Sequence, residues 1–170
     1  MRNIAAALML VIAGCSFKPL HDVRDRETGR AAEQAAAISI PPVAGPDGRH
    51  GITLRNKLLD KLTPKGRPEE PLYSLNIEMT PAAEGIYTID QYGAATSYSV
   101  STRVRYRLYS MAERKTLLDR SITGQATYNI LSDQYSSEML KRNAINLAIQ
   151  DAAEQIYLGI ITHFAGAGGE

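Results

Sequence analysis

The sequence is poor in the residues that hold small secreted domains and metal sites together. Its 170 residues include one cysteine, three histidines and no tryptophan. A single cysteine excludes an internal disulfide, so a packed core must hold the domain together. The sequence has no histidine or cysteine cluster with metal-site spacing, no glycine-rich phosphate loop and no Gly-x-Ser-x-Gly elbow. We therefore expect a protein that is not an enzyme and that holds no metal or cofactor.

Neither sign of charge is in excess. The chain has 19 Lys and Arg side chains against 18 Asp and Glu. A nucleic-acid-binding domain would carry a basic excess, so that class of function is excluded. There is also no long hydrophobic run, because the apolar stretch from Ile4 to Ile12 is far shorter than the roughly 20 residues that cross a bilayer.

The N-terminus has the layout of a bacterial secretory signal. Arg2 is followed by the apolar stretch, and Ala13-Gly14 precedes Cys15. A small-residue pair directly before a cysteine resembles the lipobox of bacterial lipoproteins, in which the thiol is acylated and the cysteine becomes the new N-terminus. We predict a signal peptide over residues 1–14 and a lipid anchor at Cys15. The alternative is an ordinary signal peptide with an incidental cysteine.

The remaining chain divides into a tether, one domain and a tail. Residues 21–34 mix charged side chains with almost no apolar periodicity, so residues 15–35 are expected to be the acylated cysteine and a flexible tether. About 15 such residues span roughly 20 Å as a coil. A single α+β domain is expected over residues 36–164, and a disordered tail over 165–170.

Hydrophobic periodicity predicts the elements of this domain. A short strand is expected near Ala37–Ile40 and a helix over Ile52–Leu62, with Ile52, Leu58, Leu59 and Leu62 on its apolar face. Alternation from Tyr73 to Met79 predicts a strand that Pro81 interrupts, and the segment to Asp90 is expected to continue its line. A long helix is expected from Ser137 to Phe164, capped by Ser136.

The clearest pattern is a long hairpin. Alternate residues from Tyr98 to Leu108 are apolar or aromatic apart from Thr102, and a second apolar face runs from Leu118 to Tyr128. Matching the two faces pairs Leu108 with Leu118, Val104 with Ile122 and Tyr98 with Tyr128. The fold class is then α+β: a two-layer sandwich in the order β-α-β-β-β-α, with an antiparallel-rich four-stranded sheet and both helices on one face.

Three arginines stand on the other face of this hairpin. Arg103, Arg105 and Arg107 alternate with the core residues, so their stems lie about 6.6 Å apart. Arginine binds phosphate and carboxylate bidentately, and a row of three suits a ligand with several negative charges. The alternative is a solvated strand face, partly neutralised by Asp119 and kept charged to discourage edge pairing.

Several segments are similar to a known family. Residues 14–20, Gly-Cys-Ser-Phe-Lys-Pro-Leu, resemble the Gly-Cys-Gly-Phe-Arg-Pro-Leu-Tyr start of alphaproteobacterial lipopolysaccharide-assembly lipoproteins, the LptE family. Ser16 and His21 depart from that start. The other matching segments are Leu54-Arg55-Asn56 with Leu58 and Leu62, Ala95-Thr96, Tyr106-x-Leu108 and Thr127-Tyr128-Asn129.

This resemblance implies an outer-membrane lipoprotein anchored at the periplasmic face. Such proteins plug the lumen of an LptD-type β-barrel, assist its assembly and support the insertion of lipopolysaccharide. On this interpretation Arg103, Arg105 and Arg107 contact either lipopolysaccharide phosphates or acidic barrel residues. The alternative function is an auxiliary lipoprotein of an ABC-type periplasmic lipid transporter. Ser16, rather than Asp, after the anchor favours outer-membrane sorting.

Overall fold

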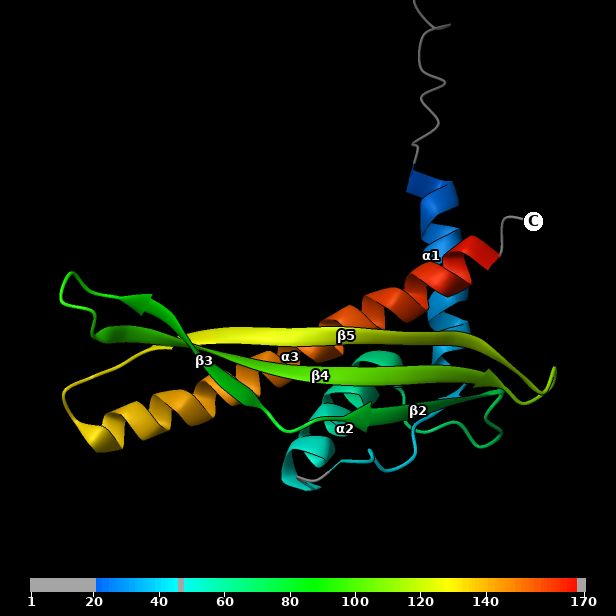
Figure 1. The fold of residues 1–170 in the computed structure, drawn as a ribbon. Helices are drawn as coiled ribbons and strands as arrows, with labels where there is room; N and C mark the ends of the chain where they lie inside the picture. The colour runs from blue at the N-terminus through cyan, green and yellow to red at the C-terminus, as the bar shows by residue number, and fades with distance from the viewer. Residues whose placement is uncertain (1–20, 46–47, 168–170) are drawn as a thin grey trace, which may run out of the picture.

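A layer of helices covers one face of a five-stranded sheet (Figure 1). The computed structural model describes residues 21–45 and 48–167. In chain order the elements are α1 (His21–Ala36), β1 (Ile38–Ser39), α2 (Gly48–Leu62), β2 (Tyr73–Met79), β3 (Ala83–Ile89), β4 (Ala95–Ser110), β5 (Lys115–Asn129) and α3 (Gln134–Ala167). The predicted α+β sandwich is confirmed, with five strands in place of four and three helices in place of two.

Strand β4 is the centre of the sheet. Strand β5 pairs with it antiparallel along one edge, while β2 and β3 share its other edge end to end. Thr80 joins these halves, because its N–H donates to the carbonyl of Arg103 at 3.0 Å. The expectation that the chain continues in line beyond Pro81 is therefore confirmed, and the continuation forms a separate strand. Strand β1 adds in parallel to β2.

The predicted hairpin register is confirmed. Leu108 lies opposite Leu118, Val104 opposite Ile122 and Tyr98 opposite Tyr128. Val104 and Leu108 are fully buried and Tyr106 is 1% exposed. The alternation of apolar and polar residues thus decides which face of β4 meets the helices.

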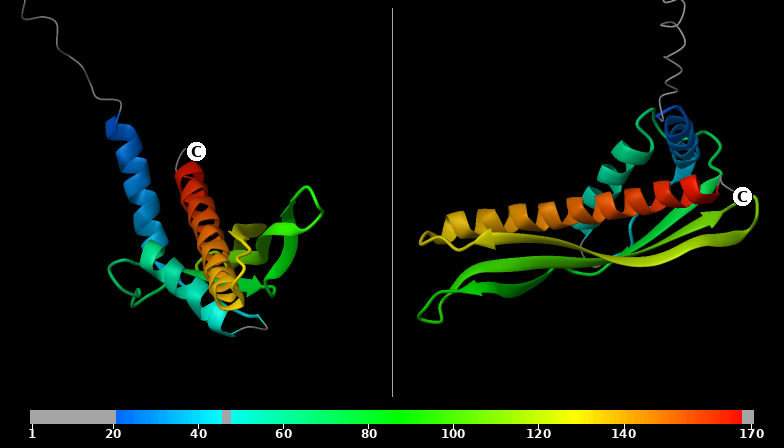
Figure 2. Two further views of the ribbon diagram at one scale, coloured as in Figure 1. Left: turned by 90° about the vertical axis from the view of Figure 1, so that its left-hand side faces the viewer. Right: turned by 90° about the horizontal axis from the view of Figure 1, so that it is seen from above.

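Helix α3 lies lengthwise against the hairpin (Figure 2). It lies very close to β5 at Gly124, where an added Cβ would stand 2.1 Å from the carbonyl oxygen of Ala148 and 2.8 Å from the Cβ of Ala152. Only a residue without a side chain fits there. Helices α1 and α2 in turn pack on α3, and their buried residues Ala35, Leu58 and Leu62 join the main core.

Helix α1 corrects the predicted tether. The chain from His21 to Ala36 is helical, so a flexible tether through residue 35 is wrong over this stretch. Ala31 and Ala35 are each 1% exposed and belong to the core. They lie one helical turn apart, and their small side chains let α1 approach the other helices closely. Residues 1–20, with the predicted signal peptide and Cys15, lie outside the described residues.

Three further predictions need correction at the helices. Gly51, Leu54, Leu58 and Leu62 form the buried side of α2, whereas Ile52 is 62% exposed. At the start of α3, Asp133 is the cap, because its Oδ2 accepts the N–H of Ser136 at 2.8 Å. Ala165–Ala167 continue α3, so the disordered tail is wrong for these residues, while residues 168–170 are not described. None of the helices in the described residues has the length and apolar character of a membrane span.

Candidate functional site

The uncovered face of the sheet is polar along its length. Its outward residues on β4 and β5 pair directly across the hairpin, Ser99 with Thr127, Ser101 with Gln125 and Arg103 with Thr123. Further along the same face stand Arg105, Arg107, Asp119 and, on β2, Glu78. One half of the face is therefore uncharged and hydrogen-bonding, and the other half is charged.

Arg105 is held by a two-pronged ion pair. Its Nε donates to Asp119 Oδ1 at 2.9 Å and its Nη2 to Oδ2 at 2.7 Å. This hydrogen bonding lowers the pKa of Asp119 and raises the pKa of Arg105. The two residues are not directly opposite in the register, since Asp119 faces Arg107. The sequence predicted the partner acid but not which arginine it binds.

The three arginines differ in what they offer a ligand. Arg107 forms an ion pair with Glu78 across the β2–β4 pairing. Arg103 is exposed, and its guanidinium makes no ion pair with any described residue. A bound anion therefore meets Arg103 first, and it engages Arg105 or Arg107 only by competing with their carboxylates.

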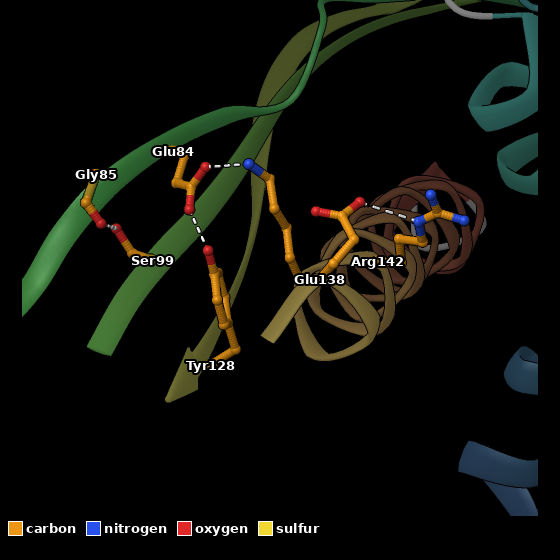
Figure 3. A network of polar contacts seen from close by, with 7 residues as sticks. Glu84, Gly85, Ser99, Tyr128, Glu138 and Arg142 are labelled. Carbon is orange, nitrogen blue, oxygen red and sulfur yellow. Dashed lines mark hydrogen bonds and ion pairs between the residues drawn. The ribbon is translucent and has the colours of Figure 1, made fainter. Parts of the chain in front are cut away.

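A second polar cluster lies where β3 crosses toward the start of α3 (Figure 3). The carboxylate of Glu84 accepts hydrogen bonds from the hydroxyl of Tyr128 and the ammonium of Lys141. The Tyr128 ring stacks on Tyr98 with centroids 5.8 Å apart. Beside it, Arg142 donates to Glu138 at 3.0 Å. These residues line a hollow of about 630 Å³.

The hydrogen bonds in this cluster favour the ionised form of the Glu84 side chain. Hydrogen bonds from Lys141 and then from Tyr128 lower the pKa of Glu84, and the same contact raises the pKa of Lys141. Burial, followed by the hydrogen bond to Glu84, raises the pKa of Tyr128. The cluster thus ties β3 to β5 and α3. Sequence reasoning missed it, because its residues lie up to 57 positions apart.

Helix α3 also closes part of the free edge of β5. Asp151 Oδ2 accepts the backbone N–H of Gln125 at 3.0 Å, and Gln155 Nε2 donates to the carbonyl of Thr123 at 3.1 Å. Within residues 21–45 and 48–167 no group of acidic, histidine or cysteine side chains has the arrangement of a metal site.

Comparison with known proteins identifies a matching family and solved structures with a similar fold. A family model described as lipopolysaccharide-assembly, LptE, matches residues 35–159. No curated protein matches the sequence. A putative lipoprotein from Caulobacter crescentus CB15 has a similar fold, with a TM-score of 0.62 and 19% identity over 82% of this chain and 98% of that chain.

More distant structures share the fold at lower identity. The rare lipoprotein B of Shewanella oneidensis has a TM-score of 0.52 and 10% identity, covering 74% of this chain and 93% of that one. A putative neuraminyllactose-binding hemagglutinin homologue from Helicobacter pylori has a TM-score of 0.53 and 12% identity, covering 77% and 87%. At these identities the likeness concerns the fold alone.

Proposed function

The chain belongs to the lipopolysaccharide-assembly (LptE) family, and we propose that it works at the periplasmic face of the outer membrane inside an LptD-type β-barrel. There it occupies the lumen, assists assembly of the barrel and supports the insertion of lipopolysaccharide. The observation that carries this proposal is the uncovered sheet face, which is polar from Ser99 to Arg107. The interior of a large outer-membrane barrel is polar as well.

The charged half of this face supports a contact with anions. Arg103 is exposed and carries a guanidinium without an ion-pair partner among the described residues, and Arg105 and Arg107 follow it along β4. Lipopolysaccharide phosphates and acidic barrel residues are the two anions that suit this row. Replacing Arg103 by alanine separates them, because loss of lipopolysaccharide binding with the barrel complex intact identifies the phosphate, and loss of the complex identifies the barrel.

The test of the function is an affinity pull-down of the tagged chain, with Cys15 intact, from detergent-solubilised envelopes. Recovery of one large outer-membrane barrel in a one-to-one ratio supports the proposal. Recovery of ABC-type transporter components without a barrel refutes it and establishes the auxiliary-lipoprotein alternative. Arg142→Ala is the matched control for Arg103→Ala, because Arg142 is also exposed but lies on α3, away from the sheet face.

The anchor is tested separately. We propose that Cys15 carries the lipid, so Cys15→Ala is expected to leave the protein in the soluble fraction after the envelope is broken and sedimented. A variant that still sediments with the membrane would refute the anchor. The barrel role does not depend on this result, because Cys15 belongs neither to α1 nor to the sheet.

A further inference from the structure

Among the described residues, the outer edge of β2 is covered and the free edge of β5 is covered in part, whereas the outer edge of β3 has no cover. The outer edge of β2 is covered by β1 and then by Ala44, whose N–H donates to Ile77 at 3.0 Å and whose carbonyl accepts from Met79 at 2.8 Å. The free edge of β5 is capped by Asp151 and Gln155. In the described part of the chain, no backbone or side-chain group hydrogen-bonds to the outer edge of β3.

Strand β3 also lacks cover on its faces. All seven of its residues are exposed, and three of them are large: Ile86 at 62%, Tyr87 at 65% and Ile89 at 61%. Its neighbour Val100 on β4 is only 1% exposed. Figure 2 shows the reason for this difference in exposure. Strand β3 and the turn after it project beyond the helices, whereas α3 runs along β4 and β5.

The usual protections of an edge strand are weak here. Natural edges carry lysine, proline or an inward charge that blocks a second strand. From Ala83 to Ile89 the one charged residue is Glu84, and Lys141 and Tyr128 already bind it. The ladder to β4 shifts its register between Ile86 and Thr88, where Tyr87 has no partner, and again between Thr88 and Ile89. From Ala83 to Ile86 the ladder is regular, so this part of the edge is extended.

We propose that β3 binds an extended segment of a protein partner as an additional strand. The edge presents backbone N–H and C=O groups, and only another extended backbone satisfies a row of them. Lipid acyl chains would cover Ile86, Tyr87 and Ile89 but leave those groups unpaired, which costs free energy. We expect the side chains of the added segment to be uncharged and in part apolar, because the one charged residue of β3, Glu84, is already bound by Lys141 and Tyr128.

This inference rests on the proposed function for its partner, which is an extended loop of the barrel. A barrel wall pairs all of its own strands, so only a loop or linker has free backbone groups to offer. The test therefore uses the full chain co-expressed with the LptD-type barrel of the same organism, purified as the complex. Hydrogen exchange of peptides covering residues 83–92 is measured in the complex and in the free chain.

The expected result is slowing of the β3 amides by about tenfold or more in the complex, since a paired amide exchanges only when the pairing opens. Two matched variants test the same contact, because Ile86 and Ile52 are equally exposed at 62%. Ile86→Lys is expected to lower recovery of the barrel under a stringent wash. Ile52→Lys, on α2, is expected to leave recovery unchanged.

The outcomes separate this inference from the function. If the complex forms and the β3 amides exchange as in the free chain, strand addition is refuted while the barrel role stands. If no complex forms, the proposed function itself is refuted. Protection that depends on the concentration of the free chain would identify a second copy as the occupant, and protection by lipopolysaccharide micelles alone would identify lipid. Either result overturns the barrel-loop assignment.

Discussion

Replacing Gly124 by alanine is expected to push α3 away from β5. The added methyl group would stand 2.1 Å from the carbonyl oxygen of Ala148, 2.8 Å from the Cβ of Ala152 and 2.9 Å from its backbone nitrogen. These atoms belong to the helix backbone or are fixed to it, so no side-chain rotation relieves the clash. Side-chain Cβ atoms do not approach other heavy atoms to less than 3.0 Å, so the helix must retreat by about 1 Å.

The magnitude follows from two opposing effects. Overpacking a close-packed contact costs about 1–3 kcal/mol. Replacing glycine in a strand returns about 0.5–1 kcal/mol, because alanine loses less backbone entropy on folding. The net loss is about 0–2.5 kcal/mol, and we expect a value of about 1.5–2.5 kcal/mol because backbone atoms collide. For a chain of this length each kcal/mol lowers Tm by about 2–4 °C, so a fall of about 3–10 °C is expected.

Thermal unfolding followed by circular dichroism measures this effect. Gly85→Ala is the matched control, because a Cβ there meets only the Ser99 hydroxyl oxygen at an ordinary 3.6 Å. That variant is expected to keep or slightly raise Tm. Equal Tm values for Gly124→Ala and Gly85→Ala would refute the close packing of α3 on β5, and with it the capping of the β5 edge by Asp151.

Three further outcomes are expected. Glu84→Gln is expected to be less stable than the parent chain at neutral pH; because the pKa of Glu84 lies below its ordinary 4.5, the difference in Tm is fully present above pH 4.5 and disappears as the pH falls through the lowered value. A difference that persists in acid would contradict the ion pair with Lys141. Val104→Asp, at a fully buried position, is expected to leave the domain unfolded, because a lone buried charge costs several kcal/mol. Circular dichroism would then show no cooperative thermal transition. Replacing Arg103, Arg105 and Arg107 together by alanine is expected to leave Tm nearly unchanged, and a large fall would show that the row stabilises the sheet.

The hairpin was predictable because its register has one solution. A slip by one residue would turn Val104 and Leu108 to solvent and bury Arg103 and Arg105, which no neighbouring charge would compensate. The same physics fixed the outward face of the arginines and their exposure. It did not fix which acid each arginine binds, because a long side chain reaches diagonal neighbours as easily as direct ones.

Helix α1 was missed for a different reason. Its buried contacts are made by Ala31 and Ala35, and alanine leaves almost no trace in a search for large apolar residues. The alanine-rich composition of residues 31–37 was a usable signal, since alanine is the strongest helix former. The Glu84 cluster and the capping of β5 depend on side chains that meet only after the sheet and α3 have packed together. No local pattern encodes such contacts.

The lengths of α3 and of the hairpin explain why one sheet face is left free. Helix α3 has 34 residues and is therefore about 51 Å long, while the 16 residues of β4 extend over about 53 Å. One helix thus spans the whole hairpin, and Gly124 with Ala148 and Ala152 lets it lie close enough for Asp151 to reach the edge of β5. With the core closed from that side alone, the opposite face needs no cover for stability. Its polar residues are then free to meet a partner, which is why we expect changes on this face to affect binding more than folding.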